Sequence, residues 1–272
     1  MKLSFSTLGC PEYDLDQVID IANRCGYDGV EIRMIRGESA LHTLEEFGPA
    51  QIGPTLDKFK RHGLEVVCIS TGVRFTSLDH EEFKEQQDLT RLNVDIAVGL
   101  GAKCIRVFGG PLPKNQDRAE TFKRIREGLA FAAQVGERHG VQVLLETHDD
   151  FSTSQQILEL LGDAEIENLG ILWDVLHPYR HGEAFAETFK ALGPRIGHVH
   201  VKDSAHFSKD GFDLTLVGEG RLPIGEAVEL LQNGGYQGYL SLEWEKAWHP
   251  EIPDAEVAFP HYVEAMKQYL SR

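Results

Sequence analysis

Four short segments in the second half of the chain carry side chains that bind divalent metal ions. Each segment is an apolar run that ends in an acid or a histidine, and the candidate ligands are Glu146, Asp174, His200 and Glu243. Three carboxylates held close together repel one another, and a divalent cation is the simplest way to keep them ionised in a partly dry cavity. Three oxygen donors and one imidazole suit Mn²⁺, the preferred ion here, or Mg²⁺ or Co²⁺, and Zn²⁺ is also compatible.

A single acidic residue at the end of a strand is more often solvated or paired with Lys or Arg than bound to a metal. That explanation is weak for the set as a whole, because four consecutive strands would each present a metal-binding side chain at the same height. We therefore expect one divalent metal ion bound by all four residues.

The elements that must position these ligands alternate along the whole chain. Eight β-rich runs are separated by amphipathic segments, a pattern that predicts parallel strands joined by crossover helices. The predicted strands are residues 3–7, 29–34, 65–71, 104–108, 141–147, 169–174, 197–202 and 238–244. The predicted helices are residues 16–25, 54–63, 81–100, 117–139, 154–161, 183–192, 224–232 and 257–270.

Eight such units without a linker predict an α/β fold, one closed (β/α)8 TIM barrel that forms a single domain over residues 1–272. An open doubly wound sheet is the alternative. The sequence lacks a G-x-G-x-x-G run after the first strand and lacks a P-loop, so a nucleotide site has no support. The active site of a barrel lies at the C-terminal ends of its strands, which is where the four candidate ligands fall.

Residues two apart in a strand point to the same side, so His198 and Lys202 should point the same way as His200. His198 would lie one layer deeper, where a hydrogen-bonded core histidine is the expected role. Lys202 would lie one layer higher, as a candidate to bind a substrate oxyanion. A salt bridge between Lys202 and Asp203 or Glu245 explains the lysine equally well.

Three more residues are candidates for binding substrate. His177 follows the predicted strand 169–174 and could donate a hydrogen bond to a substrate oxygen, or be an ordinary loop histidine. Arg33 and Arg106 lie within or at the end of strands and could anchor a substrate oxygen or phosphate, or pair with Glu31 or another buried acid. The run Gly218-Glu219-Gly220-Arg221 allows phosphate binding, and a turn before the next helix explains it as well.

Composition excludes several classes of protein. The formal net charge is −16 and there is no block of Lys or Arg, so no nucleic-acid partner is expected. No apolar run approaches the ~20 residues of a membrane span, and the N-terminus is too quickly polar for a signal peptide. The four cysteines form no C-x-x-C pair, which fits a reducing, cytoplasmic location. The sequence does not determine the oligomeric state, and a homo-oligomer is compatible with it.

These motifs resemble those of the xylose-isomerase-like TIM barrel superfamily, and within it the sugar phosphate isomerase/epimerase family. The best-matching segments are residues 145–148, 173–177, 198–203 and 238–245. The resemblance implies the metal set named above. In ketose epimerases of this superfamily the two glutamates, here Glu146 and Glu243, are also the acid and base on opposite faces of the substrate. A histidine after the strand-six aspartate, here His177, binds substrate.

The resemblance implies a divalent-metal-dependent isomerase or epimerase of a small sugar, ketose or polyol-derived ketone, acting by proton abstraction next to a metal-chelated carbonyl. Two positions differ from ketose 3-epimerases: His206 replaces an arginine and Ser152 replaces a glutamate. The pair Lys202-Asp203 is similar to inosose dehydratases, so a dehydratase that uses the same site is the alternative.

Two further alternatives are less favoured. An endonuclease IV-like hydrolase resembles this chain at several ligands, but it needs histidines at the ends of strands three and four, where this chain has Ile69-Ser70-Thr71 and Phe108-Gly109-Gly110. A non-catalytic sugar-binding barrel would lack a base, whereas both glutamates are present.

Overall fold

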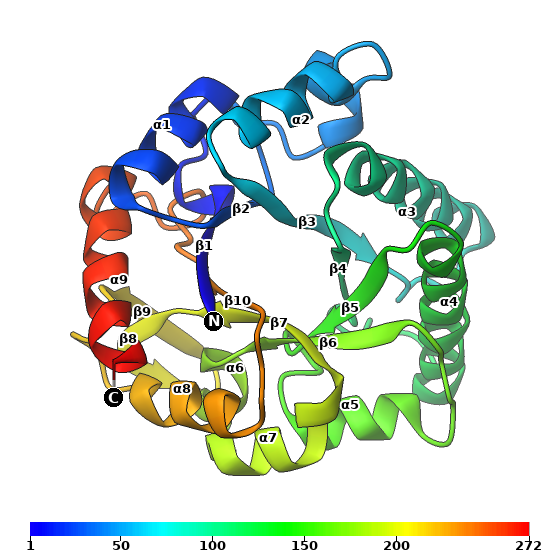
Figure 1. Ribbon diagram of the computed structural model, residues 1–272. Helices are drawn as coiled ribbons and strands as arrows, with labels where there is room; N and C mark the ends of the chain where they lie inside the picture. Colours follow the sequence, from blue (N-terminus) through cyan, green and yellow to red (C-terminus); the bar gives the residue numbers. More distant parts are fainter. Residues whose placement is uncertain (272) are drawn as a thin grey trace.

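The barrel predicted from the sequence is present in the computed structural model, which describes residues 1–271. Eight parallel strands close on themselves in the order β1, β10, β7, β6, β5, β4, β3, β2, and helices surround them (Figure 1). Each strand therefore pairs with the strands before and after it in the barrel series. The strands are β1 (Lys2–Ser6), β2 (Gly29–Ile32), β3 (Glu65–Arg74), β4 (Cys104–Phe108), β5 (Gln142–Glu146), β6 (Leu169–Asp174), β7 (Ile196–Val201) and β10 (Tyr239–Leu242).

Helices lie at all eight predicted places. They are α1 (Leu15–Cys25), α2 (Ile52–Arg61), α3 (His80–Leu100), α4 (Arg118–Arg138), α5 (Ser154–Leu161), α7 (Phe185–Leu192), α8 (Ile224–Asn233) and α9 (Ala255–Leu270). Short 3-10 helices span Thr7–Gly9, Leu41–Thr43, Glu45–Phe47 and Gly193–Arg195.

Some predicted boundaries are wrong for identifiable reasons. Pro54 is not the first residue of α2 but lies inside its first turn, where a missing N–H breaks no helical hydrogen bond. Residue 183 precedes α7, whose extended N-cap is Ala184, and the Glu183 carboxylate accepts hydrogen bonds from the backbone and hydroxyl of Ser154. Lys202 lies just beyond β7, and Glu243 just beyond β10.

Two elements after the sixth and seventh barrel strands were not predicted. The first is the short helix α6 (Leu176–Arg180), which directly follows β6. The second is an antiparallel hairpin formed by β8 (Asp203–Ser208) and β9 (Gly211–Thr215), which follows β7. Both lie at the C-terminal end of the barrel strands, so both are close to the predicted site.

The interior of the barrel has an apolar layer below a polar one. Val67, Cys68, Cys104, Leu144 and Leu172 form a separate buried cluster. Because strand side chains alternate, the residues two positions beyond Cys68, Cys104, Leu144 and Leu172 face inward again, one layer nearer the C-terminal end. In β5 this alternation places Glu146 above Leu144, and in β6 it places Asp174 above Leu172.

The side chains between these inward positions pack against the helices. Trp173 is fully buried, and its ring lies edge-on to Phe185 of α7 with 5.6 Å between ring centroids. Trp244 is also buried, and its indole N–H donates to the carbonyl of Pro253. Both tryptophans therefore serve packing, as expected from their positions next to candidate ligands.

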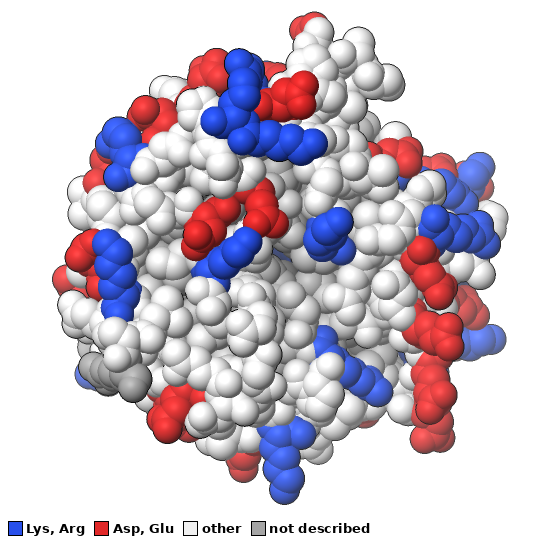
Figure 2. Space-filling model, viewed as in Figure 1, with Lys and Arg blue, Asp and Glu red and all other residues white. Residues whose placement is uncertain are grey.

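The distribution of charged side chains and the polarity of the helices agree with the predictions made from the composition. On the face of the barrel seen in Figure 2, Lys and Arg side chains are scattered among Asp and Glu side chains. Within residues 1–271, no helix is long and apolar enough to cross a membrane.

The C-terminal end of α4 gives a test of the packing. A Cβ added to Gly136 would lie 2.3 Å from the carbonyl oxygen of Val141, a backbone atom that no rotamer change can move. We expect Gly136→Ala to lower the free energy of unfolding by about 1–3 kcal/mol, as overpacking does. The measurement is the urea midpoint followed by circular dichroism.

Gly53 of α2 is the matched control, because nothing lies within 4 Å of an added Cβ there. Gly53→Ala should leave stability unchanged or raise it by up to about 1 kcal/mol through helix propensity. Equal midpoints for the two alanine variants would contradict the packing argument.

Candidate functional site

The four candidate metal ligands come together at the C-terminal end of the barrel. Glu146 ends β5, Asp174 ends β6, His200 lies in β7 and Glu243 follows β10. One ligand atom of each lies within 4.8 Å of the others, and all four residues are buried. The juxtaposition expected from strand alternation is therefore present.

His200 lies between the two glutamates. Its Nδ1 is 3.0 Å from Glu146 Oε1 and 3.2 Å from Glu243 Oε1. Its Nε2 is 2.9 Å from Glu31 Oε1 on the other side of the ring. A metal-bound histidine usually donates its second N–H to a carboxylate, which fixes the ring. The contact of Nε2 with Glu31 matches that arrangement. Nδ1 faces the two glutamates. Burial would lower the pKa of His200, but the charges of the glutamates raise it well above its ordinary value, so a cation at Nδ1 would replace a proton.

Glu31 on β2 was not predicted to have this role. Its buried carboxylate also accepts from His198 Nε2 at 2.8 Å, from Ser241 at 3.0 Å and from Ser70. Burial alone would raise the pKa of Glu31, but the charge on His200 and hydrogen bonds from both histidines lower it well below its ordinary value. The only sequence signal was an acid at an inward position of the strand Gly29-Val30-Glu31-Ile32.

His198 has the role expected of it, since it is buried and hydrogen-bonded in the core. The suggested pairing of Arg33 with Glu31 is wrong, because Glu31 is taken up by the two histidines and two serines.

The second oxygen of each glutamate is held by a basic side chain. Arg106 Nη1 donates to Glu146 Oε2 at 2.8 Å, and Lys202 Nζ donates to Glu243 Oε2 at 2.7 Å. Burial opposes ionisation of both glutamates, but Arg106 lowers the pKa of Glu146, and His200 and Lys202 lower that of Glu243 well below its usual range. Both carboxylates are therefore ionised.

Lys202 is fully buried and reaches three acids. Its Nζ also lies 2.9 Å from Asp174 Oδ2 and contacts Glu245, so one of the two salt bridges suggested from the sequence is present. Burial would lower the pKa of Lys202, but Asp174 and Glu243 raise it well above its ordinary value. Burial raises the pKa of Asp174 to about 7 although Lys202 opposes that change.

Asp203 does not pair with Lys202. Its carboxylate accepts from the backbone N–H groups of Gly218 at 2.9 Å and Gly220 at 3.0 Å. A Cβ at Gly220 would lie 2.0 Å from Asp203 Oδ1, so only glycine fits there. The run Gly218-Glu219-Gly220-Arg221, which was considered for phosphate binding, therefore binds the carboxylate of Asp203. It forms the turn that was the alternative explanation of this run.

His177 lies in α6, with Nε2 3.8 Å from Asp174 Oδ2. Burial lowers the pKa of His177 well below its ordinary value, and the positive charge of Lys202 adds to the effect. The imidazole is therefore neutral and lies beside the candidate ligands.

Arg33 differs from the other basic groups. Burial and the nearby Arg106 lower its pKa to about 10, and no hydrogen bond or ion pair within residues 1–271 holds its guanidinium. It lines a small pocket of about 180 Å³ with polar neighbours that include Thr71, Gln86 and Asn93.

The two departures from ketose epimerases do not supply charge to the site. His206 is exposed on β8, and the hydroxyl of the buried Ser152 donates to the carbonyl of Asp149.

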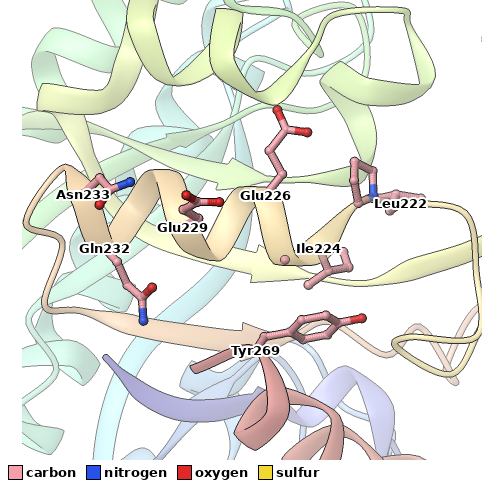
Figure 3. A pocket seen from close by; sticks show the side chains of 9 residues that line it. Leu222, Ile224, Glu226, Glu229, Gln232, Asn233 and Tyr269 are labelled. Atoms are coloured by element: carbon pink, nitrogen blue, oxygen red, sulfur yellow. The ribbon is translucent and has the colours of Figure 1, made fainter. Parts of the chain in front are cut away.

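A larger surface hollow of about 690 Å³ lies along α8, lined by Glu226, Glu229 and Gln232 among others (Figure 3). None of the candidate ligands lines that hollow.

Known proteins resemble this chain over nearly its whole length. The model of the family described as xylose isomerase-like TIM barrel matches residues 19–268. Fructoselysine 3-epimerase of Shigella flexneri is 22% identical over 250 residues, covering 89% of this chain and 90% of that protein. The 3-dehydroshikimate dehydratase of Bacillus anthracis is 27% identical over 265 residues, covering 90% and 91%.

A solved structure of the IolI protein with a bound zinc atom has a TM-score of 0.83 at 19% identity. The match covers 100% of this chain and 98% of that one. The fold of this chain is therefore similar to that of a protein whose structure contains a bound metal.

The Glu31–His200 contact predicts an effect on metal affinity. Glu31→Gln keeps the shape of the side chain but removes the charge that orients the imidazole. We expect the dissociation constant for Mn²⁺ or Zn²⁺ to rise by about tenfold to a hundredfold, as for other residues that orient a ligand. Isothermal titration calorimetry measures it.

Glu65→Gln is the control, since Glu65 is an exposed acid on β3 that pairs with the exposed Lys2. An unchanged affinity in Glu31→Gln, with the fold intact, would remove Glu31 from the proposed metal centre.

Proposed function

We propose that this chain, which belongs to the xylose isomerase-like TIM barrel family, is a divalent-metal-dependent isomerase or epimerase of a small sugar, ketose or polyol-derived ketone. Its curated relatives include sugar epimerases, isomerases and a dehydratase, and the chain is an enzyme of this kind. The observation that supports the proposed chemistry is the convergence of Glu146, Asp174, His200 and Glu243, with ligand atoms within 4.8 Å.

The donor set fits one divalent cation. Three carboxylates and one imidazole meet in a buried space, and Nδ1 of His200 is the ring atom that faces Glu146 and Glu243, so a cation bound there would replace the Nδ1 proton. An oxygen-rich set favours Mn²⁺, with Mg²⁺, Co²⁺ and Zn²⁺ as alternatives. A bound ion would act as a Lewis acid on the substrate carbonyl.

In our proposal Glu146 and Glu243 move the proton. Both are ionised, and one oxygen of each lies within 3.2 Å of His200 Nδ1, so each can accept a proton from a carbon next to the carbonyl. One glutamate would take the proton and the other would return one. Return to the opposite face of the same carbon gives epimerisation, and return to the neighbouring carbon gives isomerisation.

Four residues are proposed to bind substrate oxygens: His177, Lys202, Arg33 and Arg106. Arg106 already neutralises Glu146 through Nη1 and would donate from its other N–H groups to the substrate. Lys202 contacts three acids, so it would exchange one of these contacts for a substrate oxygen. His177 would donate from Nε2, which has no partner within the described chain. Arg33 is uncommitted, so it suits a carboxylate, phosphate or other oxygen at the far end of the substrate.

Dehydration is the second candidate, and the position of Lys202 favours it. Loss of a β-hydroxyl needs a proton donor, and a buried, protonated amine lies 2.7 Å from the proposed base Glu243. Product analysis separates the two reactions. A dehydratase forms a carbon–carbon double bond conjugated to the carbonyl, which absorbs in the ultraviolet, whereas an epimerase forms an isomer of equal mass.

Glu243→Gln tests the proton-transfer role. With Mn²⁺ at saturation, we expect deuterium exchange from solvent into substrate to fall by about a hundredfold to ten-thousandfold, the usual contribution of a general base. Proton NMR in D₂O over a panel of ketoses and inososes measures the exchange.

Glu264→Gln, on the exposed side of α9, is the matched control and should exchange at the wild-type rate. Chelator-treated enzyme should lose exchange and regain it with Mn²⁺. Exchange at the wild-type rate in metal-loaded Glu243→Gln, or full turnover by metal-free protein, would overturn the proposed chemistry.

Arg33→Met tests the substrate-binding role of the free guanidinium. A hydrogen bond to a charged group contributes about 1.5–3 kcal/mol, so KM should rise by about tenfold to a hundredfold for an anionic substrate. We expect a smaller effect on kcat, because Arg33 would bind the substrate away from the reacting carbons. Arg138→Met, at the exposed end of α4, is the control, and an unchanged KM for every substrate that is turned over would exclude the role.

A further inference from the structure

Arg180, the last residue of α6, connects the two elements that the sequence did not predict. Its Nη1 donates to the carbonyl oxygens of Ser208 at 3.2 Å and Lys209 at 2.6 Å, at the tip of the β8–β9 hairpin. Its Nε donates to Nδ1 of His177 at 3.1 Å. A single side chain therefore bridges the hairpin and a residue proposed to bind substrate.

The contact with Arg180 determines where His177 carries its proton. A guanidinium has donors and no acceptor, so the ring nitrogen it contacts must offer a lone pair. A ring protonated on both nitrogens would place N–H against N–H. His177 is therefore in the tautomer with hydrogen on Nε2.

That Nε2–H group points to the candidate site without a partner of its own. His177 is 2% exposed, and its Nε2 makes no hydrogen bond within residues 1–271. The nearest acid is Asp174, with Oδ2 at 3.8 Å, too far for a hydrogen bond. A buried donor that lacks a partner loses its hydration without compensation, so a bound ligand atom is the expected acceptor.

The hairpin also packs against His177 directly. The Phe212 ring of β9 lies edge-on to His177 with 5.8 Å between centroids, and Lys202 Nζ lies 5.6 Å from the centre of the same ring. The His148 ring contacts His177 at 4.4 Å. The imidazole is thus enclosed by aromatic rings, and Arg180 is the group that orients its hydrogen-bonding atoms.

We propose that Arg180 is a positioning residue that holds His177 in the Nε2–H tautomer. This N–H group then donates to a neutral hydroxyl or carbonyl oxygen of the substrate. Because Arg180 also binds the hairpin tip, it couples the position of this donor to the hairpin. The identity of the acceptor rests on the proposed function, whereas the tautomer does not. The class of ligand follows from the chemistry: a fixed donor requires a substrate oxygen with a free lone pair.

Nitrogen-15 NMR of histidine-labelled protein tests the tautomer without any substrate. His177→Gln identifies the ring signals by their disappearance. We expect wild-type His177 to show the Nε2–H pattern, and Arg180→Ala to show a mixture of tautomers or the Nδ1–H form. An Nδ1–H ring in the wild type, or an unchanged tautomer in Arg180→Ala, overturns the proposal. If Arg180→Ala does not fold, Arg180→Met, which keeps a long side chain but has no donor, replaces it with the same expected result, and the wild-type spectrum still decides the central point.

A double-mutant cycle separates positioning from simple anchoring of the hairpin. Arg180→Ala should lower kcat/KM by up to about tenfold, the contribution of one hydrogen bond, and should have little further effect in the His177→Gln background. Additive losses would mean that Arg180 acts only on the structure of the hairpin. Arg118→Ala, on the exposed face of α4, should match the wild type. A protein with the expected tautomer but no turnover would contradict the proposed function and leave the tautomer assignment intact.

Discussion

The site depends on one buried carboxylate. Glu31 accepts hydrogen bonds from His200 and His198 of β7, from Ser70 of β3 and from Ser241 of β10, so it joins strands that lie far apart in the sequence. An ionised acid in the centre of a barrel is strongly unfavourable unless such donors surround it. Because the same contacts fix the ring of His200, the interaction that stabilises the interior also orients the proposed metal ligand.

The polar layer above the apolar one follows the same rule of pairing. Arg106 neutralises Glu146, and Lys202 lies among Asp174, Glu243 and Glu245, so buried charges of opposite sign are matched at close range. Removing one partner of such a pair leaves an uncompensated buried charge and costs several kcal/mol. Arg33 is the exception among the basic groups described here, which is why a ligand is its natural partner.

The parts of this arrangement that could be predicted depend on short-range patterns. Alternation along β5, β6 and β7 places Glu146, Asp174 and His200 at inward positions, and the parallel barrel brings their ends together. The fold follows from the regular succession of apolar runs and amphipathic segments. These signals extend over a few residues, so they can be recognised in one sequence.

What escaped prediction depends on long-range contacts or on weak local signals. Glu31 contacts a histidine 169 residues away, and nothing near it in the sequence indicates that partner. The helix α6 has five residues, including Pro178, and the strands of the hairpin are short, mostly polar and half-buried or exposed at most positions, so neither gives a strong hydrophobic signal. The role of Arg180 depends on both elements and on the donor geometry of its own side chain.

The protein holds each candidate ligand through at least one atom, and it holds Asp174 through both oxygens, since Oδ2 also lies 2.9 Å from Lys202 Nζ. Glu146 is held through Oε2, His200 through Nε2 and Asp174 through Oδ1, which accepts from the backbone of Leu176 at 2.8 Å. Such a preorganised set can serve any reaction that begins with proton loss next to a carbonyl. The outcome must then be decided by groups around the set, such as Lys202, His177 and the hairpin, and these belong to the elements that are hardest to predict from the sequence. This division explains how one barrel framework can occur among relatives that epimerise and relatives that dehydrate.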